Sequence, residues 1–176
     1  MGKTRRIRAS ACATCVLAPN AYNVTDTIFM REVKGGVRFR GEVAGLDDGK
    51  HGIHIHQYGD LTEGCKSACA HFNPRHASHG GRTSKVRHLG DLGNVTSKKG
   101  KSNFNLFARD VSLRLANKHN IVGRMIVVHA DRDDLGQGGD AESLVTGNAG
   151  KRLACGVIGL ASPRCSIRKT RSRDVK

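Results

Sequence analysis

The sequence predicts an all-β domain arranged as a sandwich or a barrel, and three observations indicate this. Short apolar runs alternate with turn residues along most of the chain, as is typical of such folds. No stretch shows a sustained 3.6-residue apolar repeat with helix caps, so we expect no long helices. Glycine is abundant, at 22 of 176 residues, and tryptophan is absent, a composition that suits a turn-rich fold.

Eight strands are expected in chain order. They lie at 11–18, 27–34, 37–44, 50–57, 92–97, 103–108, 122–129 and 153–160. Three short connections carry turn residues and predict hairpin turns: "KGG" at 34–36, "DDG" at 47–49 and "SKKG" at 97–100.

Two connections, 58–90 and 130–152, are far longer than a turn. Long loops without regular structure are uncommon in compact domains unless they are functional or disordered. Both of these contain histidines, aspartates and glycines and neither is of low complexity. We therefore expect the chemistry of the protein to reside in these two loops.

The charge of the chain is strongly positive and concentrated at its ends. The net charge is +15, of which the first eight residues carry +4 and the last fifteen carry +5. We interpret 1–10 and 162–176 as basic, disordered extensions of one domain at 11–161, with weak polyanion binding by these tails as the alternative. No apolar run approaches the roughly 20 residues of a membrane span, and the N-terminal segment reads poorly as a signal peptide. The sequence thus predicts an intracellular, cytoplasmic protein with no membrane association.

Histidines are concentrated in the run "HGIHIHQYGD" at 51–60. In a strand, His54 and His56 would point to one face while Ile53 and Ile55 point to the other. Paired imidazoles suit zinc or copper. On this pair alone, a metal site and an ordinary pair of solvated or buried histidines stay equally open.

The following segment favours the metal site. It offers three histidines and a carboxylate, spaced eight, nine and three residues apart: His71, His79, His88 and Asp91. That donor set matches tetrahedral zinc. A further histidine, His129, ends an apolar run before a glycine-rich acidic loop. We interpret His51 as a non-ligand bonded to loop backbone, and His76 and His119 as exposed.

Six linked motifs give the chain a family resemblance: "GIHIHQYGD", "HFNP", "HGG", "RHLGDLGN", "VVHADRDDLG" and "GNAGKRLACGVIGLA". In order and spacing, across about 13–161, they resemble the copper/zinc superoxide dismutase family. The resemblance implies an eight-stranded antiparallel Greek-key barrel with two long functional loops. It also implies an enzyme that disproportionates superoxide to dioxygen and hydrogen peroxide.

Particular site residues follow from the resemblance. It implies copper, cycling between Cu(II) and Cu(I), held by His54, His56, His71 and His129. It implies zinc held by His71, His79, His88 and Asp91, with His71 shared and taking up a proton during turnover. Asp133 would link His54 to His79, and Arg152 would draw in the anionic substrate beside the copper.

The same resemblance bears on the cysteines and on partners. It implies a disulfide between Cys65 and Cys155, while Cys15 is interpreted as a buried apolar residue and Cys12, Cys69 and Cys165 as incidental extras. It implies a homodimer through apolar or small residues at Val16, Val122, Gly123, Val157 and Leu160, and a copper chaperone as a partner. Val145 stands where the family often has a lysine, so local steering of the substrate is expected to differ. The alternatives to an enzyme are a dismutase-like copper chaperone and a zinc-only polyanion-binding module.

Overall fold

The computed structural model describes residues 11–17 and 21–162. The basic extensions, the disorder and polyanion binding predicted for them, and Cys165 lie outside the described residues. Among the described residues, no helix is long and apolar enough to cross a membrane.

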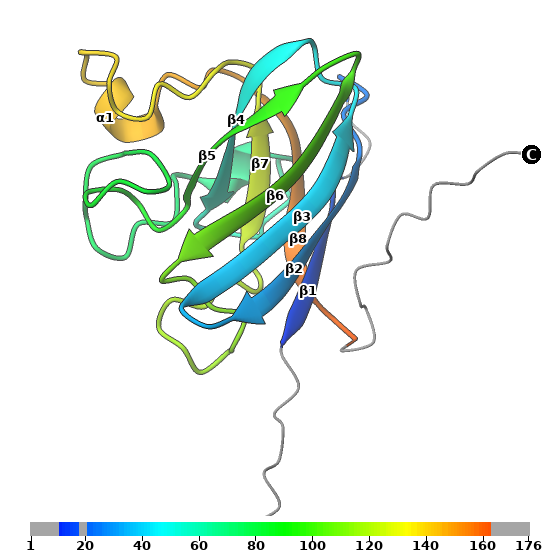
Figure 1. Ribbon diagram of the computed structural model, residues 1–176, viewed down its shortest axis with the longest axis vertical. Helices are drawn as coiled ribbons and strands as arrows, with labels where there is room; N and C mark the ends of the chain where they lie inside the picture. The colour runs from blue at the N-terminus through cyan, green and yellow to red at the C-terminus, as the bar shows by residue number, and fades with distance from the viewer. Residues whose placement is uncertain (1–10, 18–20, 163–176) are drawn as a thin grey trace, which may run out of the picture.

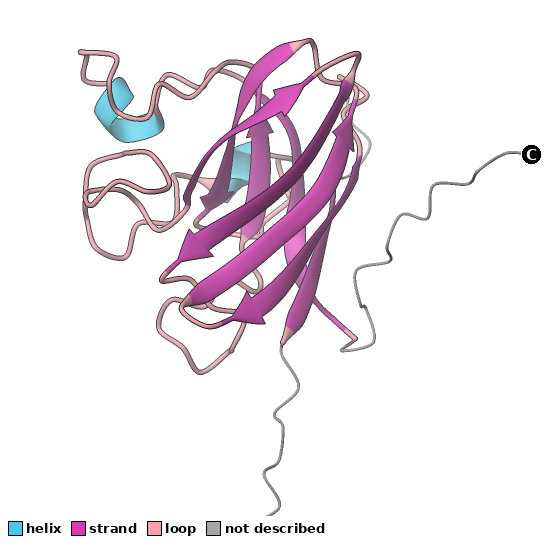
Figure 2. Ribbon diagram, in the orientation of Figure 1, coloured by secondary structure: helices cyan, strands magenta, loops and turns pink. Residues whose placement is uncertain are grey.

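Eight antiparallel strands form a nearly closed barrel, as predicted (Figures 1 and 2). They are β1 (Cys12–Leu17), β2 (Asp26–Val33), β3 (Gly36–Ala44), β4 (Gly49–His56), β5 (Asp91–Ser97), β6 (Lys101–Arg109), β7 (Met125–His129) and β8 (Arg152–Ala161). Their order around the barrel is β5-β4-β7-β8-β1-β2-β3-β6. Because β3 pairs with β6 and β4 pairs with β7, strands distant in sequence lie side by side, which is the Greek-key arrangement.

The core follows from the two-residue alternation of strands. Ile28 and Met30 of β2 and Val37 and Phe39 of β3 point inward and are at most 2% exposed. Burying a side chain of this size contributes about 2 kcal/mol relative to leaving it in water. This packed interior fixes the register of the strands, because a slip of one residue would turn each apolar side chain outward.

Two predictions about connections are wrong in detail. The "DDG" turn at 47–49 joins β3 to β4, which are not paired, so it is a crossover between the two halves of the barrel. The seventh strand begins at Met125 and not at 122, because Gly123 has a φ of +82° and residues 121–124 form a turn. The "DDG" connection is a crossover because β3 pairs with β2 and β6, whereas β4 pairs with β5 and β7. The sequence of a short connection does not reveal which strands pair. The other two predicted turns, at 34–36 and 97–100, do connect consecutive strands.

The two long loops contain the only helices that the described part of the chain forms. A 3₁₀ turn, Lys66–Ala68, lies in the loop after β4, and the four-residue α1, Ser143–Thr146, lies in the loop before β8. Figure 1 shows α1 and part of the first loop together at one side of the barrel, away from β1 and β2. These loops position the side chains described next.

Candidate metal centre

Four buried histidines converge on the face of β4 that points away from the barrel core. His54 and His56 share one face of β4, while Ile53 and Ile55 pack in the core on the other, as alternation predicts. His129 ends the neighbouring β7, and an isolated bridge places His71 beside His56. One ring nitrogen from each of the four histidines lies within 4.8 Å of the others.

A second buried group shares one member with the first. It consists of His71, His79, His88 and Asp91. The Oδ1 atom of Asp91 lies 3.0 Å from Nδ1 of His71, 3.0 Å from Nδ1 of His79 and 3.2 Å from Nδ1 of His88. Since Nδ1 of His71 faces this group, its Nε2 is left for the first group. One imidazole ring therefore separates two compact sets of donors.

Hydrogen bonds to the backbone fix which nitrogen is free in two rings of the first group. Nδ1 of His56 lies 2.7 Å from the carbonyl oxygen of Cys69, and Nδ1 of His129 lies 3.2 Å from that of Gly150. The opposite nitrogens, both Nε2, then face each other at 3.4 Å. Binding one nitrogen in this way orients the ring and leaves the other for a metal ion.

Asp133 fixes two further rings. Its carboxylate lies 2.9 Å from Nε2 of His54 and 2.8 Å from Nε2 of His79. Asn94 anchors the backbone of Asp133 on both sides, donating to its carbonyl and accepting from its amide at 2.8 Å each. Because both carboxylate oxygens are occupied by these histidines, we interpret the trio of His54, His79 and Asp133 as a positioning link and not as a third metal site.

Two buried nitrogens indicate that these groups are built for cations. Among the described residues, Nδ1 of His54 and Nδ1 of His79 have no hydrogen-bond partner. Nδ1 of His79 lies close to Asp91, but without the geometry of a hydrogen bond. An unsatisfied buried polar atom is costly, and a metal ion would satisfy both. Four imidazoles suit copper, and three imidazoles with one carboxylate suit zinc, so the residues fit the metals that the resemblance implies.

The electrostatics of the first group favour neutral, metal-binding imidazoles. Burial, assisted by the neighbouring histidines, places the pKa of His56 and of His129 well below the usual range and lowers the pKa of His71 to about 3. Ligand histidines must be unprotonated to bind a metal. His56 and His129 therefore each present a lone pair at neutral pH without having to lose a proton, whereas His71 would have to lose its one remaining ring proton to bind metals through both nitrogens.

The second group is charged differently. Burial of Asp91 opposes its ionisation, but the rings of His71, His79 and His88 close to its carboxylate outweigh burial and hold its pKa below the usual range. Burial of His79, which lowers its pKa, is likewise outweighed by its hydrogen bond to Asp133 and by the nearby carboxylate of Asp91, which raise the pKa of His79 to about 9. A cation bound between His79 and Asp91 would replace that proton.

A cavity of about 300 Å³ gives access to the first group. His56, His71, His129, Thr146 and Arg152 contribute to its lining, together with Glu142 and Val145. The guanidinium of Arg152 donates from one nitrogen to the carbonyl of Cys65 at 2.6 Å and from another to that of Cys69 at 2.6 Å. Backbone oxygens of the first long loop thus hold the positively charged guanidinium of Arg152 at the mouth of the histidine cluster.

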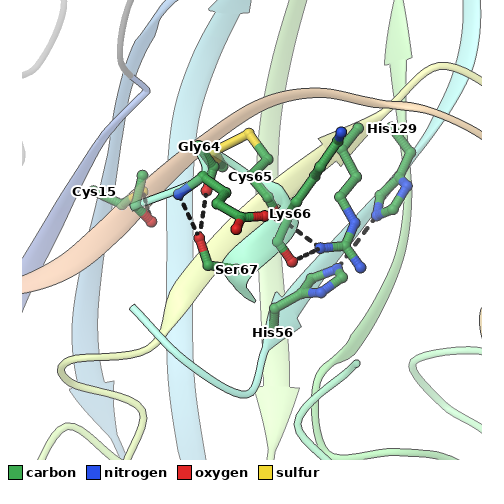
Figure 3. The surroundings of a disulfide bond; sticks show 11 residues. Cys15, His56, Gly64, Cys65, Lys66, Ser67 and His129 are labelled. Carbon is green, nitrogen blue, oxygen red and sulfur yellow. Dashed lines mark hydrogen bonds between the residues drawn. A yellow bond between two sulfur atoms is a disulfide. The ribbon is translucent and has the colours of Figure 1, made fainter. Parts of the chain in front are cut away.

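The disulfide predicted between Cys65 and Cys155 is present and ties that loop to β8. Figure 3 shows the bonded sulfur of Cys65 near Lys66, with His56 and His129 beyond them. Cys15 is fully buried, as predicted, and Cys12 is also buried, whereas Cys69 is exposed.

The remaining histidines lie outside both donor groups. His51 lies within hydrogen-bond distance of the carbonyls of His129 and Asp47, as expected for a non-ligand bonded to backbone. His76 is exposed, while His119 is half-buried and not exposed as predicted. Asn94 was not among the predicted residues, although it stands within the motif "RHLGDLGN".

Comparisons with known proteins agree with this geometry. The family model described as copper/zinc superoxide dismutase (SODC) matches residues 24–158. A "Superoxide dismutase [Cu-Zn]" of Paramecium bursaria Chlorella virus 1 is 54% identical over 140 residues, covering 78% of this chain and 74% of the relative. "Superoxide dismutase [Cu-Zn] A" of Xenopus laevis is 50% identical over 147 residues, covering 84% and 96%. An "Extracellular superoxide dismutase [Cu-Zn]" of Brugia pahangi is 44% identical over 162 residues, covering 90% and 80%. The chain belongs to the copper/zinc superoxide dismutase family.

Proposed function

We propose that the chain disproportionates superoxide to dioxygen and hydrogen peroxide. The main observation behind this proposal is that two buried donor sets share the single ring of His71. One of these sets faces the cavity that Arg152 helps to line. Dismutation needs a centre that both accepts and returns an electron, close to a source of protons and open to a small anion. The arrangement supplies a place for each of these.

In this proposal the two donor sets hold different metals. Copper would be held by His54, His56, His71 and His129, and zinc by His71, His79, His88 and Asp91. Bound copper supplies the one-electron chemistry, since it has two accessible oxidation states and zinc has none. The zinc set keeps Nδ1 of His71 engaged, so that this ring can exchange a proton only at Nε2, on the cavity side.

Arg152 would bind and orient the substrate. Its guanidinium cannot lose its charge at physiological pH, and three backbone carbonyls hold it beside the histidines that line the cavity. An incoming anion is thereby brought within reach of Nε2 of His71. The cavity of about 300 Å³, lined also by Thr146 and Glu142, has room for a diatomic anion.

We further propose that the protein is a homodimer. Val16 is 62% exposed and Leu160 is 59% exposed, on β1 and β8, which pair with each other. Large exposed apolar side chains on adjacent strands favour association with a second copy. Together with Val122, Gly123 and Val157 they form the surface proposed for the contact, and light scattering coupled to gel filtration tests it.

We also propose that the protein is cytoplasmic and that a copper chaperone delivers its copper. Cys69 is both exposed and free, and an exposed thiol is better preserved in a reducing compartment. One relative is named extracellular, so the compartment needs its own test by cell fractionation.

The direct test combines metal analysis with activity on one sample. We expect one copper and one zinc per chain, and dismutation that is lost when copper is removed and restored when copper is added back. A matched pair of variants locates the metals: His129→Gln should lose copper and keep zinc, whereas the same change at the outlying His119 should lose neither. A protein that stays inactive after copper is restored would defeat the proposal.

A further inference from the structure

A basic and aromatic surface covers the outer side of β2, β3 and β6. Six side chains form it, and we call it the basic sheet face: Phe29, Arg31, Arg38, Arg40, Asn105 and Phe107. Each alternates along its strand with inward core residues such as Ile28, Phe39 and Ala108, so all six point outward. Figure 1 shows these strands lying side by side, with α1 away from them at the other side of the barrel.

The strand register aligns these residues in two adjacent rows. Arg31 lies opposite Arg38, which lies opposite Phe107. Phe29 lies opposite Arg40, which lies opposite Asn105. Each row therefore crosses all three strands and contains both arginine and phenylalanine. Side chains directly opposite one another on such strands are about 5 Å apart at Cβ, so the six make one continuous patch.

Within the described part of the chain, no carboxylate neutralises the positive charge of this patch through an ion pair. Over the described residues, none of its three arginines forms an ion pair with a carboxylate, and the side chain of Arg38 donates only to Asn105, at 3.3 Å. The acidic residue nearest along β3, Glu42, lies instead 3.7 Å from Lys101. Like charges directly opposite, as at Arg31 and Arg38, destabilise a sheet. A like-charge pair that costs stability in one row, beside a third arginine without an ion pair in the next row, indicates that an external anion occupies the face.

The aromatic residues narrow the class of that anion. Phe29 is 36% exposed and Phe107 is half-buried, so a flat ligand can reach part of each ring. Proteins that bind single-stranded nucleic acid combine cations along the backbone with aromatic rings on which bases stack. A duplex keeps its base faces stacked internally, and a sulfated polysaccharide has no base to offer. Asn105 adds an amide that can bond a base edge or a phosphate.

We propose that the basic sheet face binds single-stranded nucleic acid without sequence preference. Arg31, Arg38 and Arg40 contact phosphates, and Phe29 and Phe107 stack on bases. The face uses no residue of the two metal-binding groups and lies on other strands than β4 and β7. Binding therefore leaves dismutation unchanged, and the proposal does not depend on the metal centre.

The test uses the full metal-loaded chain and a fluorescent 20-nucleotide oligo(dT), with anisotropy read at several salt concentrations. Two variants probe the face: Arg31→Ser/Arg38→Ser/Arg40→Ser and Phe29→Thr/Phe107→Thr. The matched control, Lys85→Ser/Lys118→Ser/Arg132→Ser, removes the same charge from exposed residues elsewhere and leaves the basic ends intact. Unchanged dismutase activity and thermal midpoint show that each variant is folded.

We expect the arginine variant to bind at least tenfold more weakly than the control and to lower the slope of log affinity against log salt by about 2, since each phosphate contact on a single strand contributes about 0.7. The phenylalanine variant should bind oligo(dT) about tenfold more weakly, and heparin with unchanged affinity. Equal affinities for the arginine variant and its control would overturn the proposal. So would a phenylalanine variant with wild-type affinity, because the face would then act, if at all, as a general anion binder.

Discussion

Cys69 adopts a backbone conformation that side chains rarely tolerate. Its φ is 59° and its ψ is −142°, a region occupied almost only by glycine, and such strain costs of order 1–3 kcal/mol. The carbonyl of Cys69 nevertheless accepts from both His56 and Arg152. The strained residue thus orients a proposed copper ligand and the proposed anion-binding arginine through its main chain alone.

Replacing Cys69 by glycine should therefore stabilise the protein and preserve its activity. We expect Cys69→Gly to raise the free energy of unfolding by about 1 kcal/mol, the relieved strain being partly offset by the greater freedom of glycine in the unfolded chain. Guanidinium unfolding of the metal-free, disulfide-bonded protein measures this. Cys69→Ala is the control, since it removes the thiol and keeps Cβ; equal effects of both variants would show that the thiol, and not the backbone, matters.

Asp133 is the residue through which the two donor sets are coupled. Asp133→Asn should lower zinc and copper affinity by about 10- to 100-fold, as is usual when a carboxylate that orients metal-ligating histidines is lost. An amide can accept from only one of His54 and His79, so one of the two rings loses its orientation. Competition with a chromophoric chelator measures both affinities. Asp131→Asn, two residues away and exposed, should change neither; if Asp133→Asn bound both metals as tightly as wild type, the linking role would be wrong.

At the scale of elements, the disulfide joins the first long loop to β8. Cys65 and Cys155 are 90 residues apart in sequence, and a covalent link over such a span contributes about 4 kcal/mol through the unfolded state. The same loop supplies the carbonyls of Cys65, Lys66 and Cys69 that hold Arg152. The stability of the protein and the placement of Arg152 therefore both depend on the disulfide that anchors this loop.

Cys65→Ser/Cys155→Ser should accordingly lose both stability and activity. We expect a lower midpoint of guanidinium unfolding, and a fall in kcat/KM larger than the fall in bound copper, because Arg152 loses its fixed acceptors while the histidines remain. Activity per bound copper separates the two effects. Cys15→Ser, which alters a buried cysteine outside the loop, is the comparison: it should cost stability with activity per copper unchanged. Full activity per copper in the double variant would contradict the link to Arg152.

The positions of the strands and of the donor residues were largely predictable from sequence. The pairing of the strands and the backbone atoms that orient the donor residues were not. Alternation along a strand is local, so "HIH" already predicted that His54 and His56 share a face. Crossing from β3 to β4 depends on which strands pair, a non-local choice that "DDG" does not encode. Backbone acceptors such as the carbonyls of Cys69 and Gly150 carry no residue-type signal, so the atoms that orient His56 and His129 emerge only in three dimensions.

At the scale of the whole molecule, charge should govern how fast superoxide arrives. The chain carries +15 for an anionic substrate, but its excess lies mainly at the two ends, outside the described residues. The cavity itself is lined by Arg152 together with Glu142 and by Val145, which is 55% exposed. Local attraction is therefore weaker than the net charge suggests, and distant charges are screened beyond about 8–10 Å at physiological salt.

Dismutation should consequently slow as ionic strength rises, and one added charge at the cavity should matter more than the same charge elsewhere. A unit charge about 10 Å from the substrate in water is worth roughly 0.4 kcal/mol, about a twofold gain in rate at low salt. We expect Val145→Lys to show that gain and a steeper salt dependence in pulse radiolysis. Val86→Lys, an equally exposed valine that does not line the cavity, should leave the rate unchanged. A wild-type rate that is flat or rising with salt, or equal gains in both variants, would mean that arrival is not steered at the cavity and that Arg152 acts only on substrate already bound.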